Sequence, residues 1–315
     1  MQADRFLGVD GGGTKTRFVL IDGTGHILAE ATRGTTYHPQ VGLDGVQAIL
    51  ADGIGQVLQA AGSDAGALDF AFFGLPAYGE DSVATARLDA IPAAILGHHR
   101  YACDNDMVCG WAGSLDCADG INIIAGTGSM GYGQRLGRGA RAGGWGEAFS
   151  DEGSAHWIAI QGLNAFSKMS DGRLPRGPLH ALLVDALRLE NDLDLCAHVY
   201  GEGGATRDAI ARLSPLVAQA AQAGDAAALG IFRQAGSELA AIADTLRRTL
   251  DYAHDETVVL SYSGGAFSAG DLLLAPFKDA LASTSPDFEL RTPVHPPHYG
   301  AALYAARLAG RPVRA

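Results

Sequence analysis

The chain has 315 residues, of which 47 % are hydrophobic and 18 % are charged, a balance typical of folded globular proteins and a length that allows two domains. Its formal net charge of −12 argues against nucleic acid or an anionic membrane as the main partner, although backbone amides can still hold an anionic nucleotide. The four cysteines lack C-x-x-C spacing, and we find neither a secretory leader nor an apolar run of about 18 residues. We therefore expect reduced thiols and a cytoplasmic protein.

The first third of the chain alternates predicted strands and helices. In chain order we predict strands at 6–10, 16–22 and 27–32, a helix at 41–61, a strand at 68–75, a helix at 81–96, a strand at 100–103 and a short helix at 106–114. Three antiparallel strands followed by parallel strands with crossover helices predict a mixed five-stranded sheet.

The pattern then restarts, and the second half becomes largely helical. We predict strands at 120–125 and 130–136, a turn at 137–139, helices at 154–170, 179–187, 206–222 and 225–252, strands at 257–262 and 288–291, and a closing helix at 297–308. The glycine-rich turns around Gly12 and Thr127 lie about 115 residues apart, which suggests an internal duplication. Because no low-complexity linker separates the halves, we expect two domains packed around a cleft.

Three glycine-rich turns each follow a predicted strand, at 11–13, 126–128 and 264–265. Glycines at 11–13 can take backbone angles closed to other residues, and they leave amides bare in a concave anion site. Asp10, directly before this turn, suits a hydrated divalent cation. Nucleotide phosphates with magnesium are the predicted ligands, although no P-loop motif is present and ligand-free hairpin turns are the alternative.

Two further polar segments are candidates for substrate chemistry. Asp104-Asn105-Asp106 ends a strand and starts a helix, so these residues either cap the helix or direct one carboxylate at a substrate hydroxyl as proton acceptor. Gly-Gly-Trp-Gly at 143–146 precedes Asp-Glu-Gly-Ser at 151–154. A tryptophan ring beside carboxylates can hold a sugar, whereas the alternative is again helix capping by Asp151 or Ser154.

The remaining histidines and cysteines show no ligand pattern. His295 and His298 lack metal-ligand spacing, and we expect them at the surface. Cys103, Cys109 and Cys117 match no common zinc or iron–sulfur spacing, and we expect buried thiols.

Taken together and in order, the motifs resemble the N-acetylglucosamine kinase branch of the BadF/BadG/BcrA/BcrD ATPase family, within the actin/sugar kinase/Hsp70 superfamily. The segments that carry the resemblance are 8–16, 105–106, 125–129, 143–146, 151–155 and 263–265, and it covers essentially the whole chain. The resemblance implies an α/β fold of two ribonuclease-H-like (actin-like ATPase) domains, each with a mixed five-stranded sheet flanked by helices, and an interdomain cleft. The implied domains are 1–115, completed by the C-terminal helix at about 296–312, and 116–295 with helical insertions.

The resemblance also implies roles for individual residues. Residues implied to bind the ATP phosphates are Gly11, Gly12, Gly13, Thr14, Lys15, Gly126, Thr127 and Gly128, with Gly264 and Gly265 against the adenosine. Asp10 would hold Mg²⁺ through water, and Asp106 matches the general base. Residues implied to contact the sugar are Tyr37, Asp106, Ser129, Gly144, Trp145 and Asp151. Relatives carry a sugar-binding asparagine where Tyr37 stands here, which leaves glucosamine, N-acetylglucosamine and N-acetylmuramic acid open as acceptors.

The implied activity is ATP-dependent phosphorylation of the 6-hydroxyl of an amino sugar, with N-acetylglucosamine as the first candidate and a homodimer as the expected assembly. One alternative within the family is an ATPase activator of a 2-hydroxyacyl-CoA dehydratase or benzoyl-CoA reductase. Such activators bind an iron–sulfur cluster through cysteines after glycine-rich turns, and the turns at 126 and 264 lack cysteine. A second alternative is a non-catalytic sugar sensor, which usually adds a helix-turn-helix segment, whereas the first strand is predicted from about residue 5.

Overall fold

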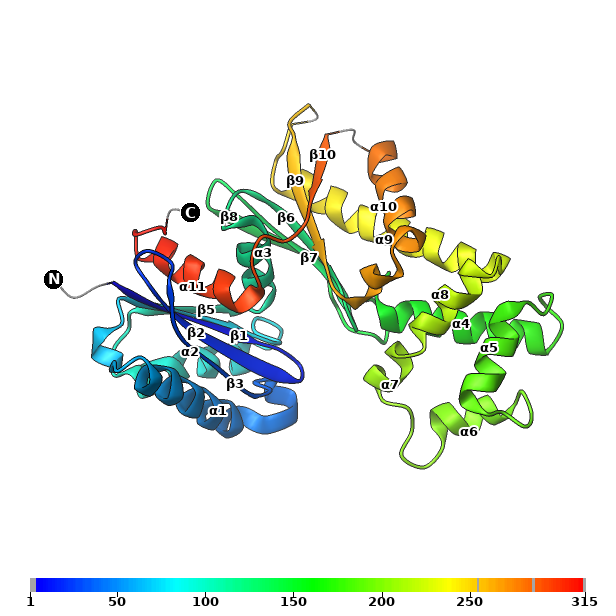
Figure 1. The fold of residues 1–315 in the computed structure, drawn as a ribbon, viewed down its shortest axis with the longest axis horizontal. Coiled ribbons are helices and arrows are strands. Elements are labelled where there is room, and N and C mark those ends of the chain that lie inside the picture. The colour runs from blue at the N-terminus through cyan, green and yellow to red at the C-terminus, as the bar shows by residue number, and fades with distance from the viewer. Residues whose placement is uncertain (1–3, 254, 285–286, 314–315) are drawn as a thin grey trace. The chain divides into compact units, whose positions relative to one another are not determined.

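The computed structural model describes residues 4–253, 255–284 and 287–313, which form two compact units (Figure 1). Unit 1 contains the chain up to Asp119 and the chain from Pro293 onward, and unit 2 contains Gly120–Thr292. Unit 1 is therefore assembled from two segments that lie far apart in the sequence.

Unit 1 is a mixed five-stranded sheet with helices on both faces. Its elements are β1 (Arg5–Gly11), β2 (Lys15–Asp22), β3 (Ile27–Gly34), α1 (His38–Ala60), the 3₁₀ turn Ala65–Ala67, β4 (Phe70–Leu75), α2 (Ser82–Leu96), β5 (Tyr101–Asn105), α3 (Met107–Leu115) and α11 (Pro297–Leu308). The strand order is β3-β2-β1-β4-β5. β1, β2 and β3 are antiparallel neighbours, and β1, β4 and β5 are parallel, which confirms the predicted mixed sheet.

Helices α1 and α2 cover one face of this sheet, and α3 and α11 cover the other (Figure 1). Because both faces are covered, successive residues of β1 such as Phe6 and Leu7 are both fully buried, without the alternation of a half-exposed strand. Tyr304 of α11 meets Phe72 of β4 and Trp111 of α3 edge to face, with ring centroids 4.9 and 5.5 Å apart.

Glycines allow the backbone of α11 to lie directly against the backbone of its neighbours. A Cβ on Gly8 of β1 would overlap the α11 backbone at Ala302, and a Cβ on Gly300 of α11 would overlap the α3 backbone at Gly113. Backbone cannot move aside as a flexible side chain can, so both positions exclude larger residues.

We expect Gly300→Ala to lower the free energy of unfolding by about 2 kcal/mol, because its Cβ would push α11 away from α3. Thermal or urea unfolding of the two proteins measures this loss. The matched control is Gly55→Ala in α1, where a new Cβ meets nothing within 4 Å. That change should stabilise the protein by up to about 1 kcal/mol, since alanine is the better helix former. Equal changes in the free energy of unfolding from both substitutions would contradict the close packing of α11 on α3.

Unit 2 repeats the sheet and adds a larger set of helices. Its elements are β6 (Gly120–Ala125), β7 (Ser129–Arg135), β8 (Arg138–Gly143), α4 (Ala155–Ser170), α5 (Pro178–Leu187), α6 (Asp194–Tyr200), α7 (Arg207–Ala211), α8 (Ser214–Gln222), α9 (Ala226–Thr249), β9 (Val258–Ser263), the 3₁₀ segment Gly265–Ala269, α10 (Asp271–Thr284) and β10 (Phe288–Arg291). The order is β10-β9-β6-β7-β8, with β6, β7 and β8 antiparallel and β6, β9 and β10 parallel. The two sheets therefore share one topology, as the hypothesis of a duplication predicts.

Helix α9 packs on β6, β7 and β8, and α10 packs on α9 (Figure 1). Two expectations for unit 2 are wrong, and some of its elements were not predicted. The predicted helix 206–222 is two helices, because Pro215 has no amide hydrogen to continue the first one. Pro215 instead stands in the first turn of α8, which begins at Ser214. The turn predicted at 137–139 is shorter, since β8 already starts at Arg138. Strand β8 and helices α6 and α10 were not predicted. No helix in the described part of the chain is long and apolar enough to cross a membrane.

Candidate active site

In unit 1, the turn that follows β1 is the first candidate phosphate loop. A Cβ on Gly11 would overlap the Thr36 hydroxyl, so a larger residue at this position would clash with Thr36. The Thr35 hydroxyl donates to the Gly12 carbonyl (2.7 Å), while Gly13, Thr14 and Lys15 are exposed. None of the three glycines has a positive φ, so the expectation of unusual backbone angles here is wrong. At Gly13, where a Cβ would meet nothing within 4 Å, glycine leaves the backbone of the loop without a side chain.

Beside this loop of unit 1, the negative charge of Asp106 acts on the carboxyl group of Asp10. Asp10 is the penultimate residue of β1, and Asp106 stands at the start of α3. The Cys109 thiol of α3 donates to the Val9 carbonyl of β1 (Sγ···O 3.6 Å). Burial and then the negative charge of Asp106 raise the pKa of Asp10 to about 8, against the opposing effect of Arg17 and Lys15. A buried carboxylate whose pKa is raised partly by a second carboxylate is typical of a functional site, and carboxylate oxygens are the ligands that Mg²⁺ prefers.

At the start of α3, the residue that caps the helix is not the candidate catalytic residue. Asn105, not Asp106, makes the side-chain bond at the helix start, because its Oδ1 accepts from the Met107 amide (3.2 Å). Asp104 Oδ1 accepts from the Asn105 amide (2.7 Å). The carboxylate of Asp106 is thus not used as the cap of α3. Tyr37, the candidate sugar contact of this unit, lies at the start of α1 and is 38 % exposed.

In unit 2, the turn 126–128 is joined to the start of α4. The Gly126 amide donates to the Gly128 carbonyl (2.8 Å), which closes the turn. The carbonyls of Gly126 and Thr127 accept from the first amides of α4, at Ala155 (2.8 Å) and His156 (3.3 Å). Gly264, with φ of +106°, lies so close to Ala125 that a Cβ would overlap its carbonyl. The glycine at 264 therefore supplies both a positive φ and a close approach to the end of β6.

A cavity of about 240 Å³ opens beside Gly265. It lies between α8 and the 3₁₀ segment, and its lining includes Ile158, Pro215, Ala218, Gln219, Gln222, Phe232, Gly265 and Ala266. Ser214 and Ser268 also line it, so apolar side chains alternate with hydroxyl and amide groups, a mixture that small-molecule sites share. The contribution of α8 was not predicted, since its glutamines carry no motif.

The glycines around Trp145 form an exposed loop. Gly143, Gly144 and Gly146 have φ of +71°, +71° and +99°, a conformation that favours glycine. Trp145 is 71 % exposed, so its ring does not serve the core. Phe149, which the sequence analysis did not select, is 75 % exposed on the same loop. Aromatic rings presented to solvent in this way can cover the C–H face of a sugar.

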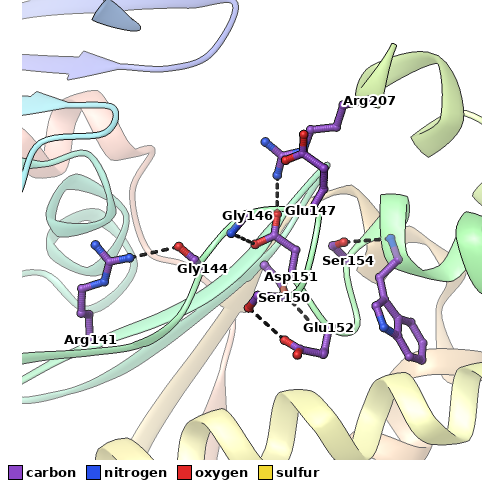
Figure 2. A network of polar contacts seen from close by, with 11 residues as sticks. Arg141, Gly144, Gly146, Glu147, Ser150, Asp151, Glu152, Ser154 and Arg207 are labelled. Atoms are coloured by element: carbon purple, nitrogen blue, oxygen red, sulfur yellow. Dashed lines mark hydrogen bonds and ion pairs between the residues drawn. The ribbon is translucent and has the colours of Figure 1, made fainter. Parts of the chain in front are cut away.

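Below this loop, Ser129 and Asp151 are almost fully buried. The Ser129 hydroxyl donates to the Glu152 carbonyl (2.6 Å), which fixes the segment that carries Asp151. Asp151 has a φ of +61°, and its Oδ1 accepts from the Gly146 amide (3.4 Å). Its Oδ2 accepts from Arg207 Nη2 (2.5 Å), as Figure 2 shows. Burial raises the pKa of Asp151, and the Arg207 guanidinium opposes that rise.

Arg207 is a second residue of this site, besides Phe149, that the sequence did not indicate. It begins α7, 56 residues after its partner, and its only signal was the glycine-rich stretch 201–204 that precedes it. Among the other candidates, Cys109 and Cys117 are buried and Cys103 partly so, close to expectation. His298 was expected at the surface and is instead buried, with Nε2 at 2.9 Å from Glu30 Oε1. No three His, Cys, Asp or Glu side chains gather to hold a metal within the described ranges.

The paired sheets of common topology place the protein in the actin-like ATPase fold class. The chain belongs to the BadF/BadG/BcrA/BcrD ATPase family, whose model matches residues 7–305. It is similar to the N-acetyl-D-glucosamine kinase of Dictyostelium discoideum, at 29 % identity over 97 % of this chain and 98 % of that protein. It is also similar to the N-acetylmuramic acid/N-acetylglucosamine kinase of Clostridium acetobutylicum, at 27 % identity over 95 % and 97 %. A provisionally assigned N-acetylglucosamine kinase from Chromobacterium violaceum has a similar structure, with a TM-score of 0.71, 26 % identity and coverage of 97 % of this chain and 100 % of that chain.

Proposed function

We propose that the protein transfers the γ-phosphoryl group of ATP to the 6-hydroxyl of an amino sugar, with N-acetylglucosamine as the first candidate. The observation that carries this proposal is full-length similarity to two kinases of N-acetylated amino sugars, combined with a carboxylate at position 106 that does not cap its helix. The same similarity favours a kinase over an ATPase activator of a CoA-dependent enzyme or a sugar sensor.

Asp106 is proposed as the general base. It would accept the proton of the sugar hydroxyl as the oxygen attacks the γ-phosphorus and the bond to the β-phosphate oxygen breaks. The raised pKa of Asp10 supports a cation beside these two carboxylates, because a positive charge there would favour their ionised forms. Asp10 would hold Mg²⁺ through water, and Mg²⁺ would neutralise charge on the phosphates.

The glycine turns are proposed to hold the nucleotide. Bare amides of 11–13 and 126–128 would bind phosphate oxygens, together with the exposed side chains of Thr14 and Lys15. The cavity beside Gly265 would take the adenine ring between α8 and the 3₁₀ segment, with Gln219 and Gln222 as hydrogen-bonding partners.

For the sugar, Trp145 is proposed as the stacking platform and Asp151 as a hydroxyl acceptor, with further contacts from Ser129, Gly144 and Tyr37. Ser129 is 3 % exposed and already donates its proton to Glu152, so its hydroxyl would act chiefly by fixing the loop. Assembly as a homodimer also stays a prediction.

A coupled ADP-release assay over a panel of free sugars tests the proposal. We expect turnover with N-acetylglucosamine, and we expect weaker turnover with glucosamine or N-acetylmuramic acid. Phosphate on the 6-hydroxyl is then confirmed by NMR of the product. Absence of sugar-dependent ADP release from folded, nucleotide-binding protein across the whole panel would overturn the kinase proposal. Turnover of a different amino sugar alone would correct only the acceptor.

A further inference from the structure

We infer that Arg207 is a positioning residue for sugar recognition, which acts by holding the Asp151 carboxylate in its sugar-binding orientation. The inference rests on the proposed function, in which Asp151 accepts a hydroxyl of the acceptor sugar. It adds a residue to which the family resemblance gives no role.

Arg207 is held in a defined position by contacts with the loop that carries Asp151 (Figure 2). Arg207 Nη2 lies 2.5 Å from Asp151 Oδ2, whose side chain is only 4 % exposed, and Arg207 Nε lies 3.5 Å from Glu147 Oε2. The guanidinium occupies the space that a Cβ on Gly128 would fill. The candidate phosphate turn therefore needs glycine at 128 partly so that Arg207 can reach Asp151.

The two oxygens of Asp151 have separate tasks. Oδ2 is held by Arg207, while Oδ1 faces the Gly146 amide of the Trp145 loop at the long distance of 3.4 Å. A weak bond of that length leaves Oδ1 with capacity to accept from a ligand. Without a cation, burial would favour the protonated acid, which accepts less well than a carboxylate.

The charges that face Asp151 come from three segments. Glu147 and Glu152 of its own loop oppose its ionisation, and Arg207 of α7 favours it. His156 of α4 also interacts with Asp151 and Arg207, and burial together with Arg207 lowers the pKa of His156. A neutral histidine leaves Arg207 as the cation that stabilises the carboxylate. Since α7 packs on α4, the guanidinium is carried by an anchored helix.

The first test needs no substrate. In thermal unfolding at pH 8, we expect Arg207→Gln to lower the melting midpoint, because it leaves a buried carboxylate unpaired. Asp151→Asn in the same chain should recover much of that loss. Additive losses in the double variant would show that Arg207 does not act through Asp151 and would overturn the inference, whatever the enzyme's activity proves to be.

The second test uses steady-state kinetics of the full chain with N-acetylglucosamine. We expect Arg207→Gln to raise KM for the sugar at least about tenfold while KM for ATP changes less than about twofold. The acidic limb of kcat/KM should move to higher pH, since loss of the guanidinium raises the pKa of Asp151. Arg207→Lys should restore the position of that limb and part of the affinity.

The matched control is Arg212→Gln, an exposed arginine directly after α7, which should leave all these parameters unchanged. A rise confined to KM for ATP would assign Arg207 to the phosphates instead and overturn the inference. Lack of any sugar turnover by the wild-type protein would overturn the proposed function. The thermal unfolding of the single and double variants would still show whether Arg207 acts through Asp151.

Discussion

Asp106→Asn is expected to fold normally and to lose turnover by about 10²- to 10⁴-fold, the usual cost of removing a positioned base. The side chain of Asp106 does not cap α3, so the substitution should leave the helix start intact. Asparagine keeps the shape and the hydrogen-bonding capacity of the side chain but cannot accept the hydroxyl proton. KM for the sugar should therefore change little, and the loss should fall on kcat. Steady-state kinetics with saturating ATP, alongside circular dichroism, measures both.

Asp104→Asn is the matched control, because Asp104 is a carboxylate two residues before Asp106, near the end of β5. It accepts from the Asn105 amide, so its replacement should cost some stability and less than about tenfold in kcat. If Asp104→Asn abolished turnover while Asp106→Asn kept it, the base would be Asp104.

Asp10→Asn is expected to stabilise the metal-free protein at pH 8 while abolishing kinase activity. The pKa of Asp10 is raised from 3.8 to about 8, so between those values the folded state holds a proton that the unfolded state has released. Stability from this group is therefore complete below about pH 4 and is lost as pH rises toward 8, at up to about 1.4 kcal/mol per pH unit. Asparagine does not titrate and avoids that loss.

In EDTA-treated samples, the melting midpoint of Asp10→Asn should exceed that of the wild type by at least about 2 °C at pH 8, and the difference should shrink toward pH 5. Asp44→Asn, an exposed site on α1, makes the same change of charge and should show no such trend. A midpoint difference that is independent of pH would contradict the raised pKa.

Most elements of the two sheets could be predicted from the sequence, because buried strands are short apolar runs bounded by glycine or polar residues. β6 and β10 begin and end at the predicted residues, and so does α11. The misses are strand β8 and two helices of unit 2. α6 has seven residues, none of them buried, and α10 contains Pro276, so neither shows a clear apolar period.

Only part of the candidate site could be predicted from the sequence. Local segments such as 11–13, 126–128 and 143–146 could be selected from composition, since glycine-rich turns stand out in any sequence. The pairing of Asp151 with Arg207 could not, because it joins residues 56 positions apart through the packing of α7 on α4. The roles proposed for Asp106, Trp145 and the phosphate turns remain predictions that the variants above can test.

The seating of α11 on β1 and α3 has a consequence for biosynthesis. A ribosome releases the strands of unit 1 first and the helix that completes their sheet last, almost 300 residues later. Unit 2 is one continuous stretch, so it can fold while the earlier strands still lack their partner. The part of β1 and β4 that α11 covers therefore stays exposed during most of translation, and we expect chaperone capture of nascent chains to end only when α11 emerges.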